Sequence, residues 1–135
     1  MYNFEYQNPV KIIFGKGEIK KVGANIPAGS KILLTYGGGS IFKNSVYDQA
    51  KAAIQGFEVI EFGGIEPNPH YETLMKAVEI VKNESITFLL SVGGGSVLDG
   101  TKFIAAAACF EKGDPWLILS KHAPVKDALP IGAVL

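Results

Sequence analysis

A run of three glycines and a serine at residues 93–96 is the part of this chain best suited to hold a ligand. The apolar residues 86–90 precede the run, and a stretch of helical character follows it. A strand, a glycine turn and a helix in succession present bare backbone N–H groups and a positive helix end, which together attract a phosphate. Glycine also lets the backbone approach a ligand with no Cβ in the way. The segment therefore predicts an anion site, with a nucleotide diphosphate as the expected ligand.

A second turn of the same kind follows the apolar run 31–36, where three glycines and Ser40 occupy residues 37–40. Ligands of open α/β sheets bind outside the carboxyl ends of the strands, so the two turns are expected to line one cleft and to contact different phosphates. Neither turn has the G-x-G-x-x-G spacing, and three glycines alone are a weak signal. The prediction depends on finding two such turns, each between a strand and a helix.

The turn at residues 37–40 also bears on the choice between NAD and NADP. An acidic side chain that bonds the 2′-hydroxyl of NAD would repel the 2′-phosphate of NADP. Residues 35–46 contain no Asp or Glu, while Ser40 offers a hydroxyl donor and Lys43 a positive charge. The turn therefore favours NADP over NAD, and the competing interpretation is a tight turn without a ligand.

Ser96 and the residues that follow the turn at residues 93–96 also have purely structural interpretations. Ser96 and Asp99 have the spacing of a capping box, in which both side chains bond backbone N–H groups at the start of a helix. Such a cap is compatible with phosphate binding, because it would order the same amides. For Lys102 the alternative to ligand contact is a solvated position on the helix surface.

The rest of the chain predicts alternating strands and helices, and therefore a Rossmann-like α/β fold with a parallel sheet and flanking helices in one domain, residues 1–135. A capping box at Ser45 and Asp48 is expected to start a helix that Gly56 ends, and Asn68 is expected to cap a helix with Pro69 at its first position. The expected strands are residues 4–6, 10–14, 31–36, 57–62, 86–91 and 129–135, and the expected helices are 18–22, 45–55, 69–81 and 97–110. The apolar end of the chain suggests a domain that is cut short.

Composition excludes several classes of function. Hydrophobic residues make up 47% of the chain, enough for a core, and the formal net charge of zero gives no electrostatic case for nucleic acid or an anionic membrane. No apolar run approaches the roughly 20 residues of a membrane span, and the first residues do not have the pattern of a signal peptide. The single cysteine, Cys109, fits a small core residue in a reducing compartment. A cytoplasmic protein is expected.

Residues 93–102, Gly-Gly-Gly-Ser-Val-Leu-Asp-Gly-Thr-Lys, resemble the glycine-rich signature of the iron-containing alcohol dehydrogenase family. Segments 9–17, 35–40, 62–69 and 114–116 extend the resemblance over the whole chain, and they are similar to the NADP-dependent, broad-range aldehyde reductase and butanol dehydrogenase branch. The resemblance implies that Asp99 contacts the cofactor near its nicotinamide end, with Lys102 close by. The cofactor-binding residues indicated by the turns and by the resemblance are Gly37, Gly38, Gly39, Ser40, Gly93, Gly94, Gly95, Ser96, Val97, Asp99 and Lys102.

The resemblance further implies the N-terminal domain of a two-domain dehydrogenase that transfers hydride between NADP and a small alcohol or aldehyde. The family's Fe²⁺ or Zn²⁺ is held by an aspartate and three histidines of a helical domain, which this resemblance places beyond Leu135. His70 and His122 are solitary, so no metal ligand and no catalytic residue are expected here, and the chain alone is expected to be inactive. A homodimer formed through the opening strands is possible by the same resemblance.

Two alternatives remain open from the sequence. One is a related nucleotide domain, such as that of glycerol dehydrogenase or dehydroquinate synthase, whose metal and substrate are set by another part of the protein. The other is a nucleotide-binding module without catalytic function.

Overall fold

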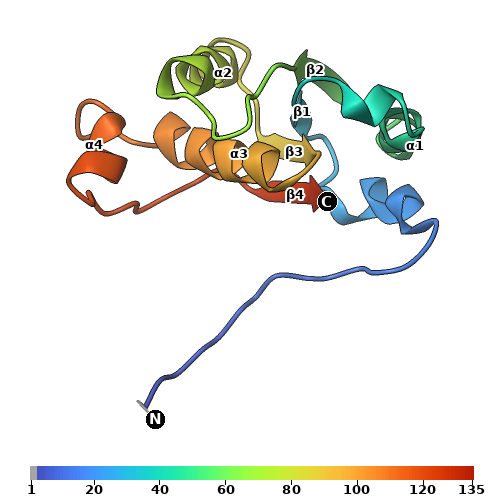
Figure 1. Ribbon diagram of the computed structural model, residues 1–135, viewed down its shortest axis with the longest axis horizontal. Coiled ribbons are helices and arrows are strands. Elements are labelled where there is room, and N and C mark those ends of the chain that lie inside the picture. The colour runs from blue at the N-terminus through green and yellow to red at the C-terminus, as the bar shows by residue number, and fades with distance from the viewer. Residues whose placement is uncertain (1–2) are drawn as a thin grey trace.

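The structure is a computed structural model that describes residues 3–135 (Figure 1). Its four strands form one sheet in the order β2-β1-β3-β4, and every neighbouring pair is parallel. The strands are β1 Lys31–Thr35, β2 Glu58–Phe62, β3 Phe88–Val92 and β4 Ile131–Val134. The α-helices are α1 Val46–Ala53, α2 Tyr71–Asn83, α3 Gly95–Ala108 and α4 Trp116–Ser120. The short 3₁₀ helices are η1 Glu18–Lys21, η2 Gly23–Asn25 and η3 Ser40–Phe42. The Rossmann-like prediction is confirmed.

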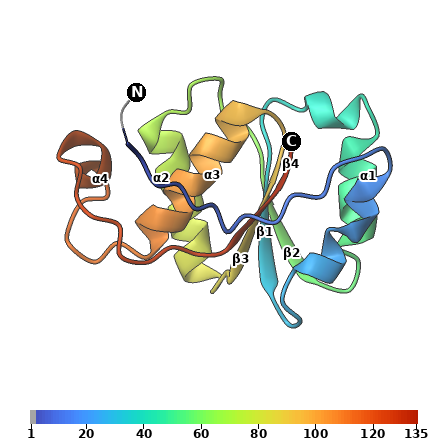
Figure 2. The ribbon, with the colours of Figure 1, turned by 90° about the horizontal axis from the view of Figure 1, so that it is seen from below.

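Helices cover both faces of the sheet, α2 and α3 on one face and α1 on the other (Figure 2). The alternation of side chains along β1 explains this arrangement. Leu33 packs in the cluster that contains α2 and α3, whereas Ile32 and Leu34 pack in the cluster that contains α1. All three side chains are fully buried, so the central strand is apolar on both faces, as expected of a parallel sheet.

The connections leave β1 and β3 in opposite directions across the sheet. The chain passes from β1 through α1 to β2 on one side, and from β3 through α3 to β4 on the other. Thr35 of β1 is the register partner of Ser91 of β3, so the two strands end at almost the same level. A crevice forms where strand order reverses in this way, and it lies at the carboxyl ends of the strands. Both glycine turns begin at this edge.

The prediction of strands at residues 4–6 and 10–14 is wrong for the structure. Residues 3–14 form no strand and run away from the layers of the domain (Figure 1). Phe4 is 87% exposed and Phe14 is 97% exposed. A strand needs a hydrogen-bonded neighbour, and this segment has none within residues 3–135, so its apolar pattern alone does not produce one.

The first predicted helix begins where expected, directly after Ser45, but the predicted capping box is wrong, and the second helix begins later than predicted. Ser45 adopts a left-handed backbone conformation with φ 61°, and its side chain makes no cap; the N–H of Val46 is instead bonded by Asn44 Oδ1 at 3.2 Å. Asn68 likewise has φ 54°, and α2 begins only at Tyr71. A capping residue has an extended backbone, so the residue type at the right spacing is not sufficient. One face of α2 is buried in the core, at Leu74, Ala77, Val78 and Val81.

The segment at residues 114–120 forms a helix that the sequence did not reveal. Asp114 Oδ1 accepts a bond from the N–H of Trp116 at 2.8 Å, and α4 begins there. Trp116 lies on this helix, 47% exposed, with its ring 5.2 Å from that of Tyr71. The fourth strand is confirmed, and α3 begins and ends two residues earlier than expected.

Candidate functional site: two glycine turns at the carboxyl edge of the sheet

Three loops meet at the carboxyl edge of the sheet, one after each of β1, β2 and β3. The N–H of Ile65 donates to the carbonyl of Tyr36 at 3.2 Å, and the N–H of Gly64 donates to that of Gly37 at 3.0 Å. The N–H of Asn68 donates to Ser96 Oγ at 3.4 Å. The loop after β2 therefore connects the two glycine turns, which lie side by side at this edge.

The start of α3 carries no side-chain cap. The helix begins at Gly95 with Gly94 at its N-cap, and Ser96 lies inside the first turn, where its Oγ accepts the bond from Asn68. The capping box of Ser96 and Asp99 is therefore wrong. The first amides of a helix have no intrahelical acceptor, and this helix has 14 residues to contribute to its dipole. An anion is the partner that these uncapped amides suit.

The glycines of the two turns fall into two groups. Gly93 has φ 152° and Gly39 has φ 99°, conformations that other residues rarely adopt. A Cβ on Gly37 would lie 3.2 Å from the carbonyl oxygen of Ile65, so this position is also tight. A Cβ on Gly38, Gly94 or Gly95, in contrast, would meet no atom within 4 Å, and none of these residues has a positive φ. The fold does not require glycine at these three positions, which is what a close approach by a ligand would explain.

Val97 lies behind the turns rather than facing solvent. It is 6% exposed, and its N–H is bonded to the carbonyl of Gly94 at 3.1 Å. Its Cγ2 would be 2.9 Å from a Cβ on Gly93 and 3.4 Å from one on Gly37. Val97 thus fills the space between the two turns.

Asp99 and Lys102 form an ion pair on the surface of α3, with Asp99 Oδ1 3.5 Å from Lys102 Nζ. Their side chains are 73% and 59% exposed, so the pair contributes little to folding. Ser40 and Lys43 are also exposed, at the start of η3 and just after it. These four side chains are accessible from solvent, whereas Val97 is not.

The structure also shows an acidic residue that sequence reasoning missed. Glu61, near the carboxyl end of β2, accepts bonds from the Tyr47 hydroxyl at 2.7 Å and from Lys51 Nζ at 2.9 Å. Burial alone would raise the pKa of Glu61, but the hydrogen bonds from Lys51 and Tyr47 outweigh it and hold this pKa below its usual value. The bond to Glu61 is the main reason that the pKa of Tyr47 rises to about 12. No short motif connects these residues, so only the packing of α1 on β2 reveals them.

The described residues do not fit a catalytic metal. No group of three or more His, Cys, Asp or Glu side chains within residues 3–135 could hold an ion. His70 is 68% exposed, with Glu66 3.8 Å away. Burial raises the pKa of the Cys109 thiol, which suits a packing residue rather than a ligand. Across the same residues, no helix combines the length and apolar character needed to cross a membrane.

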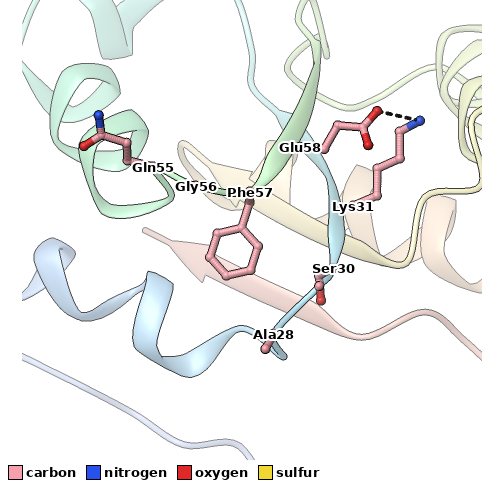
Figure 3. Close-up of a pocket in the computed structure, with 8 residues that line it drawn as sticks. Ala28, Ser30, Lys31, Gln55, Gly56, Phe57 and Glu58 are labelled. Carbon is pink, nitrogen blue, oxygen red and sulfur yellow. Dashed lines mark ion pairs between the residues drawn. The ribbon is translucent and has the colours of Figure 1, made fainter.

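Two surface hollows lie away from the glycine turns. One, of about 380 Å³, lies at the amino ends of β1 and β2. It is lined by Lys31 and Glu58, whose ion pair (Figure 3) joins Nζ and Oε1 at 3.0 Å. The other, of about 300 Å³, lies between the end of α3 and residues 124–127. Ligands of parallel α/β sheets bind at the opposite edge from the first hollow. The candidate site is therefore the open edge formed by the turns.

Comparison with known proteins shows that the chain belongs to the iron-containing alcohol dehydrogenase family, whose model matches residues 9–135. The NADPH-dependent aldehyde reductase YqhD of Escherichia coli is 56% identical over 137 residues, covering 100% of this chain and 35% of that protein. The probable NADH-dependent butanol dehydrogenase 1 of Bacillus subtilis is 49% identical over 138 residues, with the same coverage. This chain thus spans about a third of the length of these curated relatives.

Solved structures of relatives have the same fold. The substrate- and cofactor-free form of the E. coli aldehyde reductase YqhD superposes with a TM-score of 0.95 at 54% identity, covering 99% of this chain and 36% of that one. The NADH-dependent butanol dehydrogenase A of Thermotoga maritima gives a TM-score of 0.93 at 43% identity, covering 100% and 35%. Relatives described as NADPH-dependent and as NADH-dependent both occur, so the comparisons do not decide between the two cofactors.

Proposed function

We propose that this chain is the cofactor-binding domain of an NADP-dependent alcohol dehydrogenase or aldehyde reductase acting on a small alcohol or aldehyde. The observation that carries the proposal is the pair of glycine turns at the reversal of strand order, with the uncapped start of α3 at their centre. Family membership supports the reaction class, since the relatives named above are described as alcohol dehydrogenases or aldehyde reductases.

Each turn has a distinct role in this proposal. The amides of residues 94–96 hold the pyrophosphate, because no side chain caps them and because Gly94 and Gly95 are exposed and Ser96 is half-buried. The turn at residues 37–40 faces the adenosine ribose, where Ser40 and Lys43 provide a hydroxyl and a positive charge for a 2′-phosphate. The absence of Asp and Glu from residues 35–46 supports NADP over NAD. Asp99 and Lys102 are proposed to lie toward the nicotinamide.

When bound, NADPH would supply the hydride for reduction of an aldehyde, and NADP⁺ would accept it in oxidation of an alcohol. The residues described here bind and orient the cofactor, and none of them is proposed to be catalytic. Because they offer no metal site, no step of the reaction is assigned to a metal held by them. We further propose a cytoplasmic protein, which the single unpaired Cys109 supports, and a homodimer, which the exposed apolar side chains of residues 3–14 support.

Equilibrium binding tests the proposal. The protein purified from its complete coding sequence is titrated with NADPH and with NADH, and binding is followed by nicotinamide fluorescence. We expect NADPH to bind at least about tenfold more tightly, which corresponds to about 1.4 kcal/mol. Equal affinities would contradict the choice of NADP, and failure to bind either nucleotide would contradict the proposed site itself.

A further inference from the structure

Three buried hydroxyl groups lie directly behind the glycine turns, on Thr35, Ser91 and Thr101. Their exposed fractions are 0%, 1% and 0%. Thr35 and Ser91 are register partners at the ends of β1 and β3, so their side chains point to the same face of the sheet. That face is covered by α3, which contributes Thr101. Buried hydroxyls are costly unless they are hydrogen-bonded, so the partners of these three groups indicate what each one does.

The hydrogen bonds of Thr101 and Thr35 form a chain with a defined direction. Thr101 Oγ1 lies 2.7 Å from the carbonyl oxygen of Val97 and 2.6 Å from Thr35 Oγ1. A carbonyl can only accept, so Thr101 donates its single hydroxyl proton to Val97. Thr35 has two acceptors in reach, Thr101 Oγ1 at 2.6 Å and the carbonyl of Leu90 at 3.4 Å, and it donates to the nearer one, Thr101. The chain therefore runs from the end of β1, through α3, to the carbonyl of Val97.

Val97 is the residue at which this chain reaches the site. Its side chain fills the space between Gly93 and Gly37, and Gly94, to which its N–H is bonded, carries an exposed backbone. A shift of the first turn of α3 relative to β1 would move Val97 and with it the spacing of the two glycine turns. The hydroxyl chain is the polar connection that opposes such a shift.

We propose that Thr35 and Thr101 are positioning residues for the nucleotide, which hold the amides at the start of α3 at a fixed distance from the turn after β1. The inference rests on the proposed function, since it assumes that both turns contact one dinucleotide. Neither side chain touches solvent, so neither touches the nucleotide. They act on binding indirectly, by fixing the geometry of the backbone amides that contact the nucleotide.

Substitutions of Thr101 test the proposal in the protein purified from its complete coding sequence. Thr101→Val keeps nearly the same shape and removes the hydroxyl, while Thr101→Ser keeps the hydroxyl. We expect Thr101→Val to raise the Kd for NADPH on the order of tenfold, because small displacements of binding groups are costly, and Thr101→Ser to restore most of the affinity. The KM for NADPH should rise in Thr101→Val, while kcat at saturating NADPH changes less.

Ser91 provides a matched control in the same buried layer. Its Oγ has no hydrogen-bond partner among residues 3–135. Ser91→Ala should therefore leave the Kd for NADPH unchanged, because no hydrogen bond is lost. An equal loss of affinity in Ser91→Ala and in Thr101→Val would show a general response of the layer and would overturn the proposal.

Other outcomes separate positioning from mere stability. If Thr101→Val lowers Tm but leaves the Kd for NADPH unchanged, or if Thr101→Ser is as impaired as Thr101→Val, the hydroxyl chain does not position the nucleotide. Should Thr101→Val fail to fold, Thr35→Val gives the same test with the bond from Thr101 to Val97 retained. Failure of the unmodified protein to bind any nicotinamide nucleotide would overturn the proposed function, and this inference with it, before any variant is compared.

Discussion

Substitutions of the neighbouring glycines Gly93 and Gly94 are predicted to have different effects, a loss of stability at Gly93 and a loss of nucleotide binding at Gly94. Gly94→Val should abolish or strongly weaken nucleotide binding while the protein stays folded. Gly94 has φ −81° and ψ −172°, an extended conformation that valine adopts readily, and a Cβ there meets no atom within 4 Å. Valine is a poorer N-cap than glycine, so the expected loss in the free energy of unfolding is about 1 kcal/mol or less.

The loss of binding follows from the approach of the phosphate. An oxygen bonded to a backbone N–H sits about 2.9 Å from the nitrogen, where a branched side chain on Gly94 would crowd it. Each hydrogen bond to a charged group contributes about 1.5–3 kcal/mol, so losing one raises the Kd by about 10- to 150-fold. The Kd is measured by NADPH fluorescence, and urea unfolding gives the stability of the same samples.

Gly93→Ala is the matched comparison. With φ 152° and a Cβ only 2.9 Å from Val97 Cγ2, this substitution strains the fold itself, at a cost of about 1–3 kcal/mol in the free energy of unfolding. Native affinity for NADPH in a folded Gly94→Val protein would refute the reasoning and make Gly94 a turn residue only. A Gly93→Ala protein of unchanged stability would refute the division of the glycines into two groups.

Three further predictions concern the ribose turn, the Tyr47 contact and the metal. Gly38→Asp, at a position with free space and no positive φ, should weaken NADPH binding by at least about tenfold relative to NADH, and an unchanged ratio of the two Kd values would remove this turn from the ribose site. The pKa of Tyr47 is raised from 10.0 to about 12, so its bond to Glu61 stabilises the fold fully below pH 10, and that stability is lost as the pH rises toward 12. Urea unfolding across this range should show the decline, and Tyr47→Phe should lack it; the same slope in both proteins would argue against the contact. The 135-residue chain should contain no stoichiometric iron or zinc and should not reduce an aldehyde with NADPH. Bound metal in elemental analysis, or aldehyde-dependent oxidation of NADPH, would contradict this prediction.

Errors in the sequence-based predictions arose where a conformation depends on contacts with distant residues. The apolar residues of 3–14 suit a strand, but no strand within residues 3–135 pairs with them. Ser45 and Asn68 have the side chains of capping residues, but their positive φ values are incompatible with that role. The capping box at Ser96 failed differently, because α3 begins one residue before it and Asn68 bonds its hydroxyl.

The sequence by itself determined the succession of strands, glycine turns and helices, and hence the fold class, the family and the two segments that form the candidate site. These features depend on local patterns, namely apolar runs, helical periodicity and the conformational freedom of glycine. Only the tertiary structure decided that Gly38, Gly94 and Gly95 are free of steric demands from the fold while Gly93 is not. It alone brought Thr35 into contact with Thr101, 66 positions apart, because strand register and helix packing set those distances.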